Sequence, residues 1–413
     1  NDTLAAVGDH ESQRPVLTRL VRLTGATFDD DVNCWSASMY AQALMDVAEF
    51  HAMSGDQTAR ADALGTAVDA MAALEGFAED VEALETSLRL HGIYGEWFVE
   101  RGELSKAVEV LGWARNVAVR LIELDDGPRR RYELAVVQRQ IGRSAALRGD
   151  AQLAVAELAE AVTSLRELLT QDTSVTLEIQ LVATLDDLAD VYLQEERVAE
   201  AEPLLEEGLA VMRRHLALAP EASRSRSNLA DALERLGEVR RSLGERHSAR
   251  DLSYEAVGLR RAVRDQLGTG PAAADLGISL ARAASAAPAR AADADGQAMA
   301  GEALTLLRAA WSSDRSARSA WRLLYAITVA LPFETARSGL AAARNLLHEA
   351  DSVYQHLPAE ASSAFSGLMS DIERSRALVL ESDGDILGAS SARARAVEHG
   401  RAAGPESAEH GLN

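Results

Sequence analysis

Residues 182–212 read VATLDDLADVYLQEERVAEAEPLLEEGLAVM, and this stretch decides the fold. Leu185 and Leu188 belong to an apolar pattern with helical spacing that stops at the polar turn around Glu196. A second pattern of the same kind follows and includes Leu205 and Leu209. Apolar residues at these spacings form one face of a helix. Two such helices joined by two or three residues make an antiparallel helical hairpin.

The same hairpin pattern recurs with a period of 47 residues. Four short turns follow this interval and a fifth comes 48 residues later: Gly55-Asp56, Gly102-Glu103, Gly149-Asp150, Glu196-Arg197 and Gly244-Glu245. A small residue lies seven positions before each turn: Ala48, Gly95, Gly142, Ala189 and Gly237. Further small residues follow at fixed offsets, as at Ala107 and Ala114. Closely crossing helices leave no room for larger side chains, so this periodic pattern predicts a stacked array of helix pairs.

These offsets resemble the tetratricopeptide repeat, whose motif has small residues at its positions 8, 20 and 27 and an aromatic residue at 11. The matching residues are Gly95, Phe98, Ala107 and Ala114 in one unit and Ala189, Tyr192, Ala201 and Gly208 in another. The resemblance covers residues 38–268. The period is 47 rather than 34, and the usual proline at position 32 is absent. The resemblance implies an all-α, right-handed superhelical solenoid of stacked antiparallel helix pairs.

The pattern divides the chain into four segments. Residues 1–37 are expected to form an irregular N-terminal cap with a short helix around Val16–Leu23, and residues 38–268 form five regular repeats. Residues 269–300 form a degenerate repeat or an alanine-rich loop. Residues 301–413 form irregular C-terminal repeats and a cap, with a turn expected at Leu331–Phe333 and another at Asp383-Gly384.

Composition limits the partners and the compartment. The net charge of −22 disfavours direct binding of nucleic acid or an anionic membrane. Cys34 is the one cysteine, so no internal disulfide forms, which fits a reducing compartment, and we expect a cytoplasmic protein. No apolar run approaches the roughly 18 residues that span a bilayer. The chain begins with Asn rather than Met, so we expect a fragment of a larger protein.

The sequence contains no recognisable catalytic motif. Its nine histidines form no HisGluXXHis pair or Cys/His cluster, and it has neither a phosphate-binding loop nor a nucleophile elbow. Cys34 is interpreted as a small buried residue rather than a nucleophile. We therefore expect no catalytic, cofactor or metal site and no enzyme in this segment, and any catalytic domain would lie outside it.

Charged residues mark a candidate binding groove. In the resembling family the first helix of each pair lines the concave face, and its inward positions here include Glu49, Glu96, Arg139, Arg143, Asp186, Asp190, Glu234 and Glu238. One interpretation is that the two arginines and the neighbouring aspartates form ion pairs between repeats. The other is a basic step in an acidic wall that selects a basic or mixed-charge segment.

Aromatic residues mark a second candidate. Trp311, Trp321 and Tyr325 form the richest aromatic cluster of the chain, together with Phe333. They either pack between atypical repeats or form a hydrophobic anchor for a partner helix.

Together these patterns predict a module for protein–protein interaction. The resemblance implies the recognition or oligomerisation arm of a larger bacterial signalling or defence protein. The alternatives are a regulatory domain that senses a peptide or small ligand and a free-standing assembly scaffold. The expected partner is a protein or peptide, and homo-oligomerisation stays open.

Overall fold

The protein is all-α. The structure is a computed structural model that describes residues 10–72, 79–172, 174–286, 293–357 and 365–402, and no strand occurs in these ranges. The helices are α2 (His10–Asp30), α3 (Cys34–Ser54), α4 (Gln57–Ala72), α5 (Val81–Glu100), α6 (Leu104–Leu124), α7 (Pro128–Leu147), α8 (Ala151–Gln171), α9 (Val175–Gln194), α10 (Val198–Leu218), α11 (Ser223–Ser242), α12 (Arg246–Leu267), α13 (Gly270–Ala286), α14 (Ala294–Ser313), α15 (Ala317–Ser338), α16 (Leu340–Gln355), α17 (Ser366–Ser382) and α18 (Ile386–Ala402).

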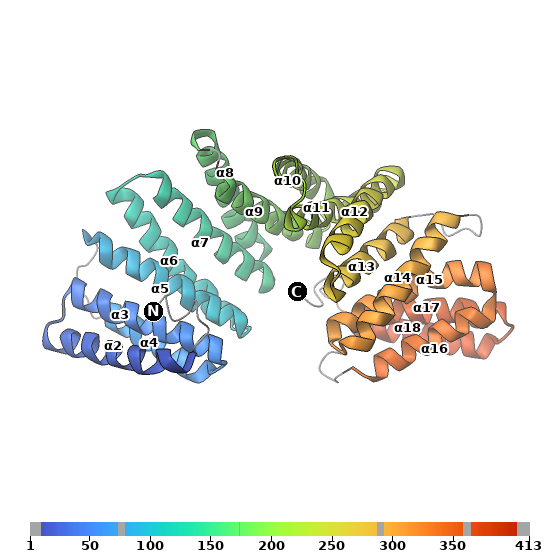
Figure 1. Ribbon diagram of the computed structural model, residues 1–413, viewed down its shortest axis with the longest axis horizontal. Helices are drawn as coiled ribbons and strands as arrows, with labels where there is room; N and C mark the ends of the chain where they lie inside the picture. The colour runs from blue at the N-terminus through green and yellow to red at the C-terminus, as the bar shows by residue number, and fades with distance from the viewer. Residues whose placement is uncertain (1–9, 73–78, 173, 287–292, 358–364, 403–413) are drawn as a thin grey trace. The chain divides into compact units, whose positions relative to one another are not determined.

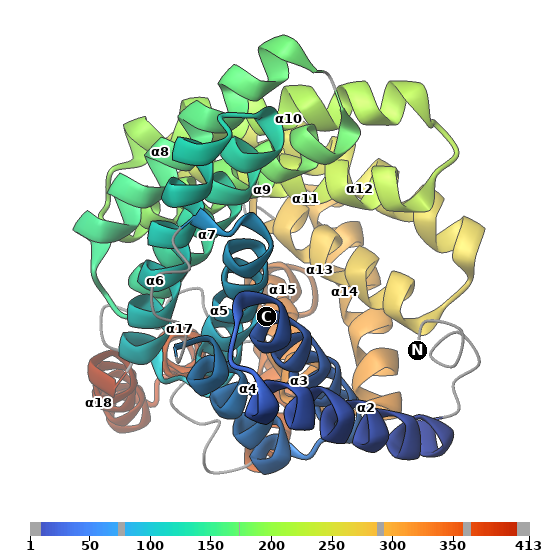
Figure 2. The same cartoon turned by 90° about the vertical axis from the view of Figure 1, so that its left-hand side faces the viewer.

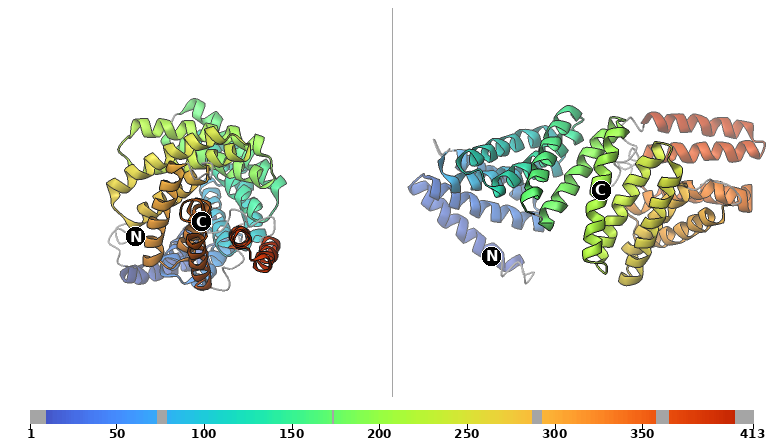
Figure 3. Two further views of the ribbon diagram at one scale, coloured as in Figure 1. Left: turned by 90° about the vertical axis from the view of Figure 1, so that its right-hand side faces the viewer. Right: turned by 90° about the horizontal axis from the view of Figure 1, so that it is seen from above.

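The chain divides into two units, Asn1–Glu195 and Glu196–Asn413. Figure 1 labels their helices in the order of the chain. In unit 1, α3 pairs with α4, α5 with α6 and α7 with α8 (Figure 2). In unit 2, α11 pairs with α12, α13 with α14 and α17 with α18 (Figure 3). We call α3, α5, α7, α9, α11, α13, α15 and α17 the first helices, and α4, α6, α8, α10, α12, α14, α16 and α18 the second helices. Consecutive first helices within each unit also contact one another, and their common surface is the first-helix face of that unit.

The short turns end the first helices in a left-handed conformation. Gly55, Gly102, Gly149, Gly244 and Gly384 have φ angles between 72° and 86°. Glu103, the residue after one of these glycines, donates its backbone N–H to the carbonyl oxygen of Phe98 at 2.9 Å. This bond satisfies a carbonyl that the helix end would otherwise leave unpaired, and glycine adopts the required φ without steric cost. The predicted turns at these positions are confirmed.

The small residues lie where paired helices cross. Gly95 and Gly142 are buried, and a Cβ atom built on either would lie 2.5 Å from Cγ of Leu111 or Leu158 respectively. Both leucines are fully buried on the second helix of the same pair, so they have no space into which to move. The helices therefore approach more closely than any side chain at these positions allows, as the sequence pattern predicts.

The N-terminal segment is more regular than the sequence suggests. Instead of an irregular cap with a short helix, residues 10–30 form α2, which packs on α3. Gln13, Leu17 and Thr24 are its buried residues. They recur at helical spacing, but two of the three are polar, so hydrophobic periodicity does not reveal this face.

The turn expected at Leu331–Phe333 is wrong. Helix α15 continues through Pro332 to Ser338 and ends at Gly339, whose φ is 80°. Leu331 and Phe333 are buried in the core of unit 2, and this burial offsets the hydrogen bond that proline removes from the helix. Within the range 269–300, α13 and the start of α14 are helical, and residues 287–292 lie outside the described part of the chain.

The helix crossing can be tested with two glycines of unit 1. A Cβ on Gly142 meets Leu158, whereas nothing lies within 4 Å of a Cβ on Gly112, which is also inside a helix. We expect Gly112→Ala to stabilise the protein by about 0.5–1 kcal/mol through helix propensity. We expect Gly142→Ala to destabilise it by about 1–3 kcal/mol through overpacking. Urea denaturation of both variants measures the difference, and shifts of the same sign would contradict the close crossing.

Candidate functional site

Polar side chains tie consecutive first helices together in unit 1. Arg89 of α5 donates to Gln42 of α3 at 2.7 Å. Gln140 of α7 donates to Glu96 of α5, also at 2.7 Å. Both contacts join residues more than 40 positions apart, which places them on successive helix pairs. Glu96, one of the residues expected in the groove, is therefore part of an inter-repeat contact, while Glu49 is exposed on α3.

Arg139 and Arg143 lie beside α9, but their partner is Asp187. Nε of Arg139 is 2.5 Å from Oδ2 of Asp187, and Nε of Arg143 is 3.7 Å from Oδ1 of the same residue. Burial raises the pKa of the Asp187 carboxyl, and the two arginines oppose this effect. Asp186 and Asp190, which the sequence suggested as partners, are half-buried on the same helix. The contacts favour the interpretation that these arginines join repeats.

Glu234 of unit 2 also holds neighbouring first helices together. Its carboxylate is buried and accepts hydrogen bonds from Oγ of Ser279 and Nη1 of Arg282, both on α13. On the same face, Arg322 of α15 donates to Asp275 of α13 at 2.8 Å. Three consecutive first helices, α11, α13 and α15, are thus linked by charged side chains.

The three aromatic residues of the second candidate have different environments. Trp321 and Tyr325 stack one helical turn apart on α15, with ring centroids 5.4 Å apart and planes 4° from parallel. Both are partly buried. Trp311 is only 6% exposed and belongs to the core of unit 2, with the Arg315 guanidinium 4.6 Å from its ring. Trp311 therefore packs between repeats, and the accessible aromatic pair consists of Trp321 and Tyr325.

The structure brings this pair next to the charged residues of α11 and α13. Burial raises the pKa of the Tyr325 hydroxyl, a hydrogen bond with Ser285 lowers it, and Arg282 and Glu238 act on it electrostatically. Burial lowers the pKa of the Arg282 guanidinium, but Glu234 and Tyr325 outweigh this effect and raise it, and 44% of the side chain remains exposed. We call the surface formed by these neighbouring side chains the unit-2 site and define it by Glu234, Glu238, Arg282, Ser285, Trp321 and Tyr325.

Solved structures of helical proteins are similar to this chain. The apo form of RapI matches with a TM-score of 0.58 at 14% sequence identity, covering 97% of this chain and 95% of that chain. BtubC from P. vanneervenii matches 62% of this chain at 16% identity, covering 92% of that chain with a TM-score of 0.48. A tetratricopeptide repeat protein from Parabacteroides merdae matches 76% of this chain at 14% identity, covering 93% of that chain with a TM-score of 0.41. The fold is that of a tetratricopeptide-type helical repeat. No family model and no curated protein sequence matches the chain.

The second helices of this tetratricopeptide-type array carry a further set of ion pairs. Arg213 and Glu255 are 2.8 Å apart, and Arg308 donates two hydrogen bonds to Glu349 at 2.7 and 2.6 Å. Each pair joins consecutive second helices and spans 41 or 42 residues. Sequence reasoning missed these pairs, although an arginine followed by a glutamate at that interval is a signal visible in the sequence.

Other candidate sites are weaker. Cys34 is half-buried, and burial together with Asp80 raises the pKa of its thiol, which disfavours the reactive thiolate. The described residues contain no group of His, Cys, Asp and Glu side chains that could hold a metal ion. None of the described helices is both long and apolar enough to cross a membrane.

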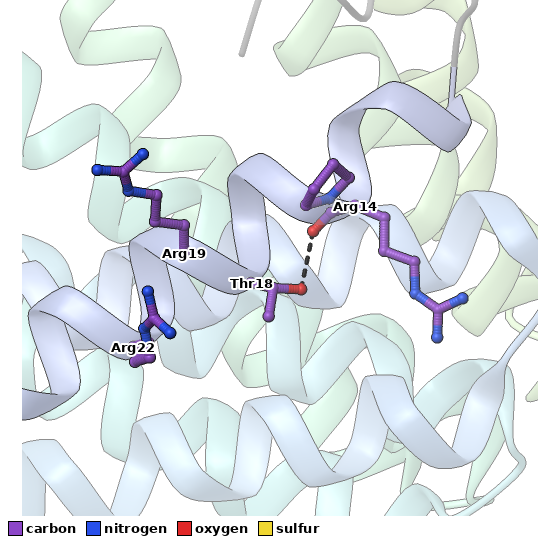
Figure 4. A pocket seen from close by; sticks show the side chains of 5 residues that line it. Arg14, Thr18, Arg19 and Arg22 are labelled. Atoms are coloured by element: carbon purple, nitrogen blue, oxygen red, sulfur yellow. Dashed lines mark hydrogen bonds between the residues drawn. The ribbon is translucent and has the colours of Figure 1, made fainter.

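A shallow cavity of about 430 Å³ lies along α2 (Figure 4). All five lining residues come from that one helix, and Arg14 points away from Arg19. Their guanidinium groups therefore do not converge on a common ligand position. The lining residues are Arg14, Pro15, Thr18, Arg19 and Arg22.

The two arginines of unit 1 provide a matched test of the inter-repeat interpretation. The Arg139 side chain is 21% exposed and contacts Asp187 closely, whereas Arg143 is 56% exposed and more distant. We expect Arg139→Gln to destabilise the protein by about 1.5–3 kcal/mol, because it removes a charged hydrogen bond from a partly buried carboxylate. Arg143→Gln should lower the free energy of unfolding by about 0–1 kcal/mol, which is what an exposed ion pair contributes. Chemical denaturation of both variants checks this order, and the reverse order would contradict it.

Proposed function

We propose that this chain is a protein-binding module that uses the unit-2 site to recognise a basic or mixed-charge segment of a partner protein. The observation that supports this proposal is the stacked, partly exposed pair of Trp321 and Tyr325 beside charged residues of α11 and α13. Partly exposed aromatic rings supply contact area at low cost in side-chain entropy, and they recur as energetic centres of protein interfaces.

Charge determines which partner the site prefers. The chain carries a net charge of −22, and Glu238 lies exposed at the site beside the aromatic pair. Glu234 is already neutralised by Arg282, so the accessible carboxylate is that of Glu238. Arg241 on the same helix pairs with Glu238 at the surface, where such a pair exchanges readily with other partners. A partner cation can therefore compete for Glu238 while its apolar part covers the rings.

The module is proposed to act as the recognition or oligomerisation arm of a larger signalling or defence protein. Two features support a non-catalytic role. The first-helix faces use their charged groups mainly to hold neighbouring repeats together, as Glu234 and Asp187 do. Burial and the nearby Asp80 raise the pKa of the Cys34 thiol, which disfavours the reactive thiolate. Binding that is spread over a face made of several rigid helices is typical of repeat proteins.

A peptide-binding experiment tests this function. The full chain is titrated with fluorescent peptides of equal length that are basic, mixed-charge or acidic, each with and without a central Leu-Phe pair. We expect the basic and mixed-charge peptides with the apolar pair to bind most tightly, and their affinity to fall as salt screens the charges. Glu238→Lys and Trp321→Leu should each weaken binding about tenfold or more.

The matched control is Glu255→Lys, which makes the same change in charge on the second-helix side of unit 2. We expect it to leave the peptide affinity unchanged. Tightest binding of acidic peptides, or equal losses from Glu238→Lys and Glu255→Lys, would contradict the proposed site. Binding of a small ligand at the aromatic pair with no binding of any peptide would favour a sensing domain instead.

A further inference from the structure

A second cavity lies outside the first-helix face, where α6, α7 and α8 meet in unit 1. Its volume is about 410 Å³, within the range of about 300–1,000 Å³ that is usual for ligand pockets. Three helices contribute to its walls, in contrast to the single helix that lines the cavity on α2. The lining residues are Arg115, Asn116, Val119, Leu134, Gln138 and Glu160.

The carbonyl oxygen of the buried Gln138 amide accepts no hydrogen bond from the described residues. This side chain is 4% exposed, and its Nε2 donates to Oε2 of Glu160 at 2.6 Å. The amide has one possible orientation, because turning it over would place its oxygen against the carboxylate. Its Oε1 atom is buried and has no hydrogen-bond partner among the described residues. Buried acceptors in folded proteins are nearly always paired, so this unpaired oxygen in a residue of the cavity lining is an acceptor for an N–H group.

The charges around the cavity favour a cation. Glu157 lies next to the lining, is 4% exposed and accepts a hydrogen bond from Nη1 of Arg115. Burial raises the pKa of Glu157, Arg115 lowers it, and Glu160 raises it further. Arg115 therefore neutralises Glu157, while the Glu160 carboxylate at the rim contributes a negative charge with no cationic partner among the described residues. The second oxygen of Glu157 is also buried and has no hydrogen-bond partner in the described part of the chain.

One wall of the cavity is apolar. Val119 is 42% exposed and Leu134 is half-buried, so the cavity offers carbon surface beside its acceptor end. A methylene chain that carries a charged head matches this arrangement. An ammonium head has three N–H donors on one compact atom, whereas a guanidinium presents five in a wide planar fork.

We propose that this cavity binds an alkylammonium group, supplied by a lysine side chain of a partner protein or by a free diamine. The ammonium donates to Oε1 of Gln138 and to the Glu160 carboxylate, and the methylene stem lies against Val119 and Leu134. The chain does not supply this group itself from its described residues, because its single lysine, Lys106, pairs with Glu103 at 2.7 Å. The site is separate from the unit-2 site and does not depend on it.

Calorimetric titration of the full chain tests the site with four probes. These are acetyl-Ala-Lys-Ala-amide, the same peptide with norleucine or arginine in place of lysine, and cadaverine. We expect the lysine peptide or cadaverine to bind at least about tenfold more tightly than the norleucine and arginine peptides. Tighter binding of the lysine peptide identifies a partner's lysine as the source, and tighter binding of cadaverine identifies a free amine.

Substitutions locate the binding to the cavity. Glu160→Gln keeps an acceptor for Gln138 but removes the charge, and it should weaken binding of the amine about tenfold. Gln138→Met removes the buried amide at similar volume and should also weaken binding. Glu109→Gln makes the same charge change at an exposed position of α6 outside the lining and should leave binding unchanged.

Three results would overturn the proposal. They are no binding of either amine, equally tight binding of the norleucine or arginine peptide, and an unchanged dissociation constant in Glu160→Gln. If Gln138→Met fails to fold, Glu160→Gln at the exposed rim still decides the outcome. The two sites share no residue, so Glu160→Gln tests this cavity while Glu238→Lys and Trp321→Leu test the unit-2 site.

Discussion

The close crossing of paired helices at small residues is the constraint on which the rest of the structure depends. At Gly95 and Gly142 the partner helix lies so near that a single added methyl group would overlap a buried leucine. The left-handed turns at Gly102 and Gly149 reverse the chain within two residues, so the second helix returns directly along the first. Each hairpin can bury its remaining apolar surface only against the next hairpin, which produces a stack and leaves the first helices side by side.

Arginine makes many of the contacts that join one hairpin to the next. Lys106 is the only lysine among the 42 lysine and arginine residues of the chain. A guanidinium can donate two parallel hydrogen bonds to one carboxylate, as Arg308 does to Glu349, and its length spans the distance between successive helices. On the second-helix side these pairs are structural ties. On the first-helix face of unit 2, the ion pair between Arg282 and Glu234 lies beside Tyr325, so one ion pair both joins two repeats and belongs to the proposed site.

The sequence predicts what depends on local pattern and misses what depends on neighbours. The helical hairpins, the left-handed turns and the crossing at Gly142 follow from spacing and residue size, so they can be read directly. The partner of Arg139 could not be chosen from the sequence, because Asp186 and Asp187 are adjacent and only the rotation of α9 decides which faces α7. Pro332 led to a wrong prediction of a turn, because burial of its neighbours in the core keeps α15 continuous.

The residues of the unit-2 site were predicted only separately, because contacts between helices do not follow from local pattern. Glu234, Glu238, Trp321 and Tyr325 were each singled out, but as members of two separate surfaces. Arg282 lies between them and falls in the alanine-rich segment whose weak periodicity hid helix α13. Once α13 is placed, its arginine and Ser285 connect the two groups. Side chains from three hairpins lie together at the unit-2 site, and local sequence patterns do not predict contacts between separate hairpins.

Hydroxyl-radical footprinting of the full chain tests the central claim that the unit-2 site is where a partner binds. Oxidation of individual aromatic side chains is measured with and without a bound basic peptide, and Trp113, which is 61% exposed on α6, serves as an internal reference. The account predicts that the peptide protects Trp321 and Tyr325 and leaves Trp113 unchanged. Unchanged oxidation of Trp321 and Tyr325 while the peptide is bound would contradict it.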